Sequence, residues 1–384
     1  MREVIEFGSG RQARRSWDLH QIGIVPARRA RSSKDVDVTW KFDAYDFELP
    51  IVGHPTDATM SPESIIKLGK LGGLGVLNAE GLWGRLEDPA AAIDEVIKTA
   101  EVDTVQVDGA ANKVLQKYHS QPINEALLEA RIKEIRDAGV TVAVRVSPQH
   151  ARELAPLLVK AGVEILFIQG SLLSADYVDS NDSDGSSLDV ASLVGELELP
   201  VVVGGVLDYS TALHLMRTGA AGVIVGPGSE ELSSSYGIHV GMATAIADVA
   251  AARRDYLDET GGRYVHVIAD VGSYSETTGD IARAIACGAD AVALGSAFAR
   301  TSDTPGKGWF WRAAAAHPKY PRSAVTFQID MPPEAEDVPS LEQLLLGPTS
   351  MPWGTENLVG GLRRAMAKCG YTDLKSFQRV ELTI

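Results

Sequence analysis

The chain has 384 residues, of which 45% are hydrophobic, so it can bury a large core. Its formal charge of −15 argues against general nucleic-acid binding, and only residues 11–34 are locally basic. It has no run of about 18 apolar residues and no apolar signal core, so we expect a cytoplasmic protein without membrane contact. Cys287 and Cys369 lack His or Cys partners at ligand spacing, which excludes a disulfide framework and a structural zinc site.

Eight short runs of β-branched and small residues recur along the chain, separated by helical stretches. The runs are ELPIVGHP from Glu48, GKLGGLGVLN from Gly69, DAGVTVAVRV from Asp137, KAGVEILFIQG from Lys160, LPVVVGGV from Leu199, RTGAAGVIVG from Arg217, YVHVIADVG from Tyr264 and ACGADAVALG from Ala286. Continuous apolar strands that alternate with helices indicate a parallel sheet covered on both faces. Eight such units favour an α/β fold of the TIM (β/α)8 barrel type, with an open doubly wound sheet as the alternative.

Two regions exceed the minimal barrel, and we predict that all residues 1–384 form one barrel domain. Residues 80–138 contain extra helical patterns after the second strand, which we interpret as a helical insertion. Residues 301–350 follow the eighth strand and predict a flap over the barrel mouth, with a surface-packed extension as the alternative. The acidic residues 176–189 do not match a calcium loop in any register, so we predict no metal site.

Glycine-rich segments follow the sixth, seventh and eighth predicted strands. Backbone N–H groups at such strand ends can converge on an anion, and this corner of a barrel commonly binds phosphate. Asp270 can accept two hydrogen bonds from a ribose diol. The alternative is that these glycines only turn the strands into loops. The predicted phosphate donors are the Ser229 hydroxyl and the backbone N–H groups of Gly272, Gly295 and Ser296.

Several of these segments resemble the IMP dehydrogenase and GMP reductase family, most closely its short paralogues without CBS domains. The segments include LPIVGHPTDA, LGGLGVLN, VGPGS, HVIAD, GDIARAIACGADAVALGS and LVGGLRRAMAKCGYTDL, and the resemblance covers nearly the whole chain. It implies a homotetramer that binds a purine ribonucleotide by its phosphate and ribose. It also implies NADPH or NAD(H) as cofactor, exchanging hydride with C2 of the base. Potassium is not expected as a cofactor.

The resemblance also implies site residues at the other strand ends. Thr56 and Asp57 fall in the turn after the first strand, beneath the base of the substrate. Gln169, Gly170 and Ser171 follow the fourth strand, where many family members hold the cofactor ribose. Tyr274 lies in a lengthened loop after the seventh strand and is a further candidate contact to the base.

The chain departs from the family at the catalytic loop. The family nucleophile is a Cys shortly after the GPGS turn, whereas this chain reads GPGSEELSSSYG. Cys287 cannot replace it, because it precedes the eighth strand and belongs to the opposite end of the barrel. We therefore predict that Glu230 or Glu231 protonates the ring or guides water, and that Arg312 holds an altered base substituent.

These features favour an NAD(P)-dependent oxidoreductase acting at C2 of the base of a purine or purine-analogue nucleoside 5′-monophosphate. The leading hypothesis is GMP-reductase-like reductive deamination of a guanine-type nucleotide, with deazapurines included, in specialised nucleoside metabolism. Two alternatives stay open: an IMP dehydrogenase that converts IMP to XMP with NAD, and a non-catalytic nucleotide-binding paralogue.

Overall fold

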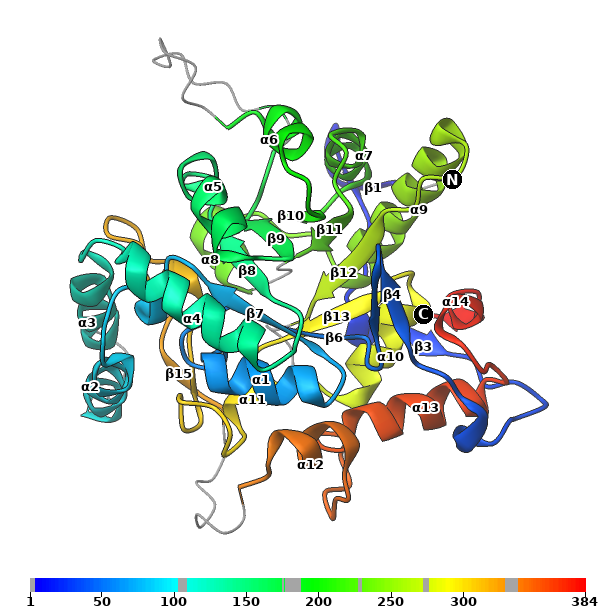
Figure 1. Cartoon of the computed structure of the whole chain (residues 1–384). Helices are drawn as coiled ribbons and strands as arrows, with labels where there is room; N and C mark the ends of the chain where they lie inside the picture. The colour runs from blue at the N-terminus through cyan, green and yellow to red at the C-terminus, as the bar shows by residue number, and fades with distance from the viewer. Residues whose placement is uncertain are drawn as a thin grey trace.

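Eight parallel strands close into a barrel in the computed structural model, which describes residues 4–102, 109–174, 176, 188–226, 230–271, 276–328 and 338–384 (Figure 1). Neighbours in the barrel are consecutive in sequence, and the last strand pairs with the first. This confirms the predicted TIM barrel, and each of the eight apolar runs supplies one strand. The strands are β6 (Ile51–Gly53), β7 (Leu74–Asn78), β8 (Ala143–Val146), β9 (Ile165–Gln169), β10 (Val201–Val206), β11 (Gly222–Val225), β12 (His266–Asp270) and β13 (Ala291–Leu294).

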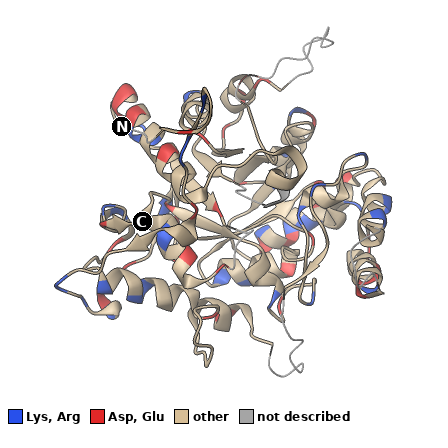
Figure 2. Cartoon of the chain, turned by 180° about the vertical axis from the view of Figure 1, so that it is seen from behind, with Lys and Arg blue, Asp and Glu red and all other residues tan. Residues whose placement is uncertain are grey.

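Helices between the strands cover the outside of the barrel (Figure 1). Polar residues begin several of them: Ser61 and Asp208 each accept a hydrogen bond from a backbone N–H in the first turn, and Thr277 forms a capping box with Asp280. Charged residues lie mainly on the outer helices and loops in Figure 2. The covering helices are α1 (Pro62–Lys70), α4 (Glu125–Asp137), α5 (Ala151–Ala161), α6 (Val190–Glu196), α7 (Tyr209–Arg217), α9 (Met242–Thr260) and α10 (Thr278–Ala286).

The segments after β7 and after β13 pack together in a second hydrophobic core. The first contributes α2 (Pro89–Val102) and α3 (Ala110–His119). The second contributes β14 (Trp309–Phe310), the 3-10 helix η4 (Ala313–Ala316) and β15 (Thr326–Phe327). Their buried side chains include Ile93, Val96, Leu115, Trp311 and Val325. The Asn112 amide also donates to the carbonyls of Ala315, at 3.0 Å, and Ser323, at 2.8 Å, which ties η4 to α3.

The remaining elements lie outside the barrel sheet. None of the helices in the described ranges is long and apolar enough to cross a membrane. The hairpin of β4 (Trp40–Phe42) and β5 (Tyr45–Phe47) lies at the amino end, where the Phe42 ring packs 4.9 Å from His266. The other elements are β1 (Val4–Gly8), β2 (Arg11–Arg14), β3 (Gly23–Ile24), α8 (Glu230–Tyr236), α11 (Ser296–Ala299), α12 (Leu341–Leu346), α13 (Leu358–Lys368), α14 (Leu374–Phe377) and β16 (Leu382–Thr383).

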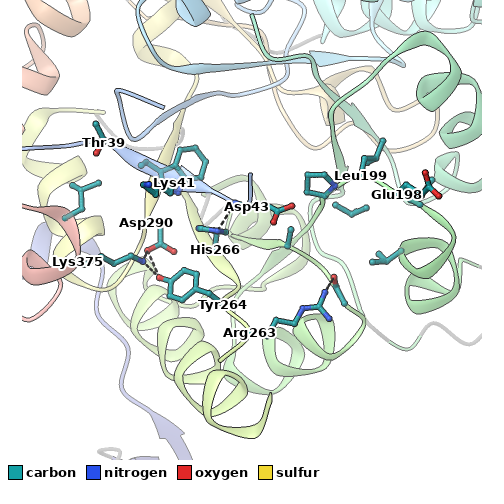
Figure 3. Close-up of a pocket in the computed structure, with 18 of the residues that line it drawn as sticks. Thr39, Lys41, Asp43, Glu198, Leu199, Arg263, Tyr264, His266, Asp290 and Lys375 are labelled. Carbon is teal, nitrogen blue, oxygen red and sulfur yellow. Dashed lines mark hydrogen bonds and ion pairs between the residues drawn. The ribbon is translucent and has the colours of Figure 1, made fainter. Parts of the chain in front are cut away.

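A buried carboxylate organises the amino end, beside a cavity of about 930 Å³ (Figure 3). Asp290 is 1% exposed and accepts hydrogen bonds from Arg253 at 2.8 Å, Lys375 at 2.6 Å and the Tyr264 hydroxyl at 2.8 Å. Burial alone would raise the pKa of Asp290, but Arg253 and Lys375 outweigh it and hold this pKa well below its usual range. The network links β13 to α9 and to the C-terminal segment.

We expect Asp290→Asn to lower the free energy of unfolding by about 3–5 kcal/mol, because it leaves the buried Arg253 without its carboxylate. The loss should shrink as pH falls below 3.8, since a carboxyl with a lowered pKa stabilises the fold only while it is ionised. Denaturant unfolding monitored by circular dichroism measures both effects. The control is Asp46→Asn, which removes an exposed pair with Lys41, 3.6 Å away, and should change little.

Candidate active site at the carboxyl end of the barrel

A cavity of about 650 Å³ opens at the carboxyl ends of the barrel strands. Its lining comes from the segments after β6, β7, β8 and β9, from α8 and from η4 with its flanks. Among the described residues that line it, Glu80 is the one acidic side chain, and four are arginines. The cavity is therefore electropositive. It suits a ligand that is anionic or that develops negative charge during a reaction. The arginines are Arg85, Arg145, Arg312 and Arg322.

A buried ion pair joins the end of β12 to the segment after β14. Arg312 binds Asp270 through both guanidinium Nη atoms, with Nη1 3.0 Å from Oδ2 and Nη2 3.2 Å from Oδ1. Asp270 is 1% exposed and Arg312 is 6% exposed, so the two charges neutralise each other away from water. The carboxylate predicted to bind ribose thus already has a cationic partner, although its oxygens retain lone pairs for further donors.

His54, the first residue after β6, completes this cluster. The same Arg312 Nη1 lies 2.6 Å from His54 Nε2. A guanidinium can only donate, so Nε2 accepts and the proton of the neutral imidazole resides on Nδ1. Burial, together with Arg312, lowers the pKa of His54 to about 4, which keeps the ring neutral at physiological pH. His54 Nδ1 is buried and has no partner among the described residues.

A second charged cluster lines the wall formed by β7 and β8. Glu80 lies 3.2 Å from Arg145 Nη1, accepts from the Ser147 hydroxyl at 2.9 Å and also contacts the His150 imidazole. Burial would raise the pKa of Glu80, but His150 and Arg145 lower it to about 2. The hydrogen bond that His150 donates to Glu80 raises the pKa of His150 in turn. Glu80 therefore stays ionised and orients one arginine and one histidine.

The predicted cofactor residues lie beside this wall. Gln169 ends β9, and its main-chain oxygen accepts from Arg145 at 2.6 Å and 3.0 Å. Gln169, Gly170 and Ser171 all line the cavity. The Gln169 side-chain Oε1 is buried without a partner among the described residues, so it is free to accept a hydrogen bond from a ligand amide.

The predicted base contacts are engaged within the protein. Thr56 Oγ1 accepts from the Ala58 backbone N–H at 3.1 Å. The Asp57 carboxylate accepts from the Leu82 backbone N–H at 2.8 Å and lies 3.2 Å from His119 Nε2. From the same turn, His54 and Pro55 line the cavity.

One of the two predicted phosphate donors at the end of β13, the Gly295 N–H, is also engaged. Gly295 N–H donates to Glu276 Oε1 at 2.8 Å, and the Ala297 N–H donates to the other oxygen of the same carboxylate. Ser296 is buried at the start of α11. Ser229, Gly272 and Tyr274 lie outside the described residues. Glu230 and Glu231 begin α8, but their side chains also lie outside what the structure describes.

The chain has known relatives over its whole length. A family model described as IMP dehydrogenase / GMP reductase domain matches residues 18–321. The chain belongs to the IMP dehydrogenase/GMP reductase family. An uncharacterized oxidoreductase of Mycobacterium tuberculosis is 56% identical over 99% of this chain and 100% of its own length. A crystal structure of an IMP dehydrogenase/GMP reductase-like protein from Corynebacterium glutamicum has a TM-score of 0.92 and 56% identity, covering 99% of this chain and 97% of that one.

An inosine-5′-monophosphate dehydrogenase of Methanocaldococcus jannaschii is a more distant relative, 25% identical over 96% of this chain and 92% of its own length. These similarities confirm the resemblance found in the sequence and make this chain an oxidoreductase-type member of the IMP dehydrogenase/GMP reductase family. The substrate and the direction of the reaction are separate questions, which the local chemistry of the site has to answer.

No cysteine of this family member lies in the cavity wall that the structure describes. Cys287 caps the C-terminal end of α10, and burial raises its pKa to about 12. Cys369 follows α13, and burial raises its pKa as well. Thiols with raised pKa values carry little thiolate at neutral pH, so neither replaces the family nucleophile.

Sequence reasoning missed several residues of the site. Glu80 and Arg145 lie at or just beyond the carboxyl ends of β7 and β8, a position that marks functional residues in this fold. That position is the signal that could have found them. Glu276 lies in the lengthened loop after β12, where the extra length was noticed but the role of the carboxylate was not.

We expect Glu80→Gln to lower the pKa of His150 toward 6.5 and to destabilise the fold by about 3 kcal/mol, because buried Arg145 loses its carboxylate. NMR titration of His150 and denaturant unfolding measure these effects. Glu80 stabilises the fold above pH 4.5 and loses this effect as pH falls toward 2. His150 contributes fully below pH 6.5 and loses its effect as pH rises through its raised pKa.

The stability difference between wild type and Glu80→Gln should therefore be largest between pH 4.5 and 6.5. Glu63→Gln is the matched control, because Glu63 pairs with Lys67 on an exposed helix surface. An unchanged His150 titration in Glu80→Gln would contradict this interpretation of the cluster.

Proposed function

We propose that this protein is an NAD(P)-dependent oxidoreductase that adds hydride to C2 of a guanine-type base and releases the amino group there. The proposed substrate carries a purine or purine-analogue base, deazapurines included. The sequence predicts that this substrate is a nucleoside 5′-monophosphate. The proposal is GMP-reductase-like in direction. The observation that carries it is the electropositive lining of the cavity at the carboxyl end of the barrel.

The charge of the cavity favours hydride addition to the substrate over hydride removal. Hydride addition places negative charge on the purine ring in the transition state, whereas hydride removal leaves the ring positive. In the part of the chain that the structure describes, Asp270 offsets Arg312 and Glu80 offsets Arg145, which leaves Arg85 and Arg322 as surplus positive charge at the cavity wall. Positive groups that are already in place stabilise developing negative charge strongly in a partly dehydrated site.

The cavity residues fit a nicotinamide cofactor. The unpartnered Gln169 Oε1 can accept a hydrogen bond from a carboxamide N–H, and Arg85 and Arg322 can face the pyrophosphate. When bound, this cofactor supplies the hydride. The protein's own residues hold the two partners together and supply the proton that the leaving amino group needs.

His54 and Arg312 are the residues we propose at the reacting end. C2 gains the hydride, the C2–N bond breaks, and the amino group leaves as ammonia after it takes a proton. The neutral His54 presents its Nδ1–H, which has no partner among the described residues, while Arg312 fixes the ring through Nε2. Glu230 and Glu231 remain predicted proton donors from the adjacent α8.

The alternative IMP dehydrogenase reaction lacks support from the site. The family cysteine implied by the sequence would serve either direction, and both cysteines of this chain lie elsewhere with raised pKa values, so the charge of the cavity is what favours hydride addition over hydride removal. A binding-only role is the stronger alternative, because Arg312 and Glu276 already satisfy the groups predicted to bind ribose and phosphate.

The test follows NADPH absorbance with guanosine, its 5′-monophosphate and their deaza analogues. We expect oxidation of NADPH that depends on a guanine-type ligand, and a loss of kcat of about 10²–10³ in His54→Gln, as for removal of a neutral hydrogen-bond donor that stabilises developing negative charge. His214→Gln changes a half-exposed histidine of α7 and should keep full activity. Ligand binding without NADPH oxidation across the panel would favour the binding-only role, and NAD reduction with IMP would favour the dehydrogenase.

A further inference from the structure

The anion cradle at the end of β13 contains a carboxylate of the protein itself. Glu276 spreads its two oxygens over the backbone N–H groups of Gly295 and Ala297, which is how such a cradle holds a phosphate. The Glu276 side chain is fully buried, at 0% exposure. Of the donors expected to recognise a ligand phosphate, the Gly295 N–H is therefore satisfied before any ligand arrives, as is the neighbouring Ala297 N–H.

The backbone around Glu276 holds this carboxylate in place. Glu276 directly precedes Thr277, whose side chain and backbone form a capping box with Asp280 at the start of α10. The next residue, Thr278, donates its backbone N–H to the Gly354 carbonyl at 2.8 Å. The cap and the Thr278 hydrogen bond therefore anchor the backbone on the C-terminal side of Glu276, from which its carboxyl group reaches the cradle.

The space around the cradle is closed as well. A methyl group added at Gly295 would come within 2.7 Å of Phe310 Cε2, so the aromatic ring packs tightly against this strand end. Glu276 itself adopts a left-handed backbone conformation, with φ of 49°, which is unfavourable for a residue other than glycine. The fold accepts this local cost together with the burial of a carboxylate, which indicates a specific role for the side chain.

We propose that Glu276 is a permanent internal substitute for the phosphate, and that the protein acts on an unphosphorylated purine-type nucleoside rather than on its 5′-monophosphate. The proposal rests on the proposed function for the class of base. It reverses the expectation from the sequence for the form of the ligand. A phosphate placed at this strand end would meet the bulk of Glu276, because both groups need the same backbone N–H donors.

Two variants separate the bulk of Glu276 from its charge. Glu276→Gly empties the cradle and suits the left-handed backbone, whereas Glu276→Gln keeps the bulk and removes the charge. Isothermal titration with guanosine, guanosine 5′-monophosphate and inorganic phosphate is run on the wild type and on both variants. Thermal unfolding with inorganic phosphate, against chloride at equal ionic strength, gives a readout that needs neither purine nor cofactor.

We expect the wild type to bind the nucleoside at least as tightly as its monophosphate and to gain no thermal stability from phosphate. In Glu276→Gly the monophosphate should gain at least tenfold in affinity, and inorganic phosphate should raise Tm, with little change in Glu276→Gln. Tenfold tighter binding of the monophosphate by the wild type would overturn the proposal, and this comparison stands even where a variant fails to fold. Phosphate binding gained in Glu276→Gly, with no purine binding by any form, would support the role of Glu276 and refute the proposed function.

Discussion

The ion pair between Asp270 and Arg312 fixes the geometry of the whole carboxyl end of the barrel. Asp270 ends β12, while Arg312 belongs to the segment that packs against α3, so the pair fastens the second hydrophobic core to the barrel. Both groups are buried, and each would be costly to leave without the other. His54 takes its orientation and its tautomer from the same guanidinium. The tautomer of the histidine in the cavity wall therefore follows from this ion pair.

One rule describes both predicted ligand anchors: each is already matched by an opposite charge or a complementary donor from the same chain. Arg312 neutralises the carboxylate predicted to bind ribose, and Glu276 fills the amide cradle predicted to bind phosphate. When a side chain of the protein already pairs with a binding group, a ligand gains little binding free energy from that group. A ligand that brings only phosphate and ribose gains little there, whereas a base that meets the unpartnered His54 Nδ1 and Gln169 Oε1 gains new hydrogen bonds.

The sequence was sufficient for the barrel because its signal is local and repeated. Each of the eight β-branched runs forms one buried strand, from Ile51–Gly53 to Ala291–Leu294. The site was predicted less completely, since its contacts join residues that are distant in sequence. Asp270 and Arg312 were each identified, yet their pairing across 42 positions carries no local pattern. Glu276 could not be assigned either, because a glutamate before a helix cap is usually a solvated side chain.

The proposed direction of hydride transfer follows from the charges that remain at the cavity wall once the two internal ion pairs are counted. Asp270 offsets Arg312, and Glu80 offsets Arg145, so Arg85 and Arg322 supply the remaining positive charge at the cavity wall, with His150 held toward its protonated form by Glu80. At the reacting end the neutral His54 adds an N–H donor without adding a full charge. A site with surplus positive charge and a neutral donor stabilises an electron-rich ring, and Glu230 or Glu231 is the predicted source of the proton for the leaving amine. Both properties serve the proposed hydride addition, and neither depends on a cysteine in the cavity wall that the structure describes.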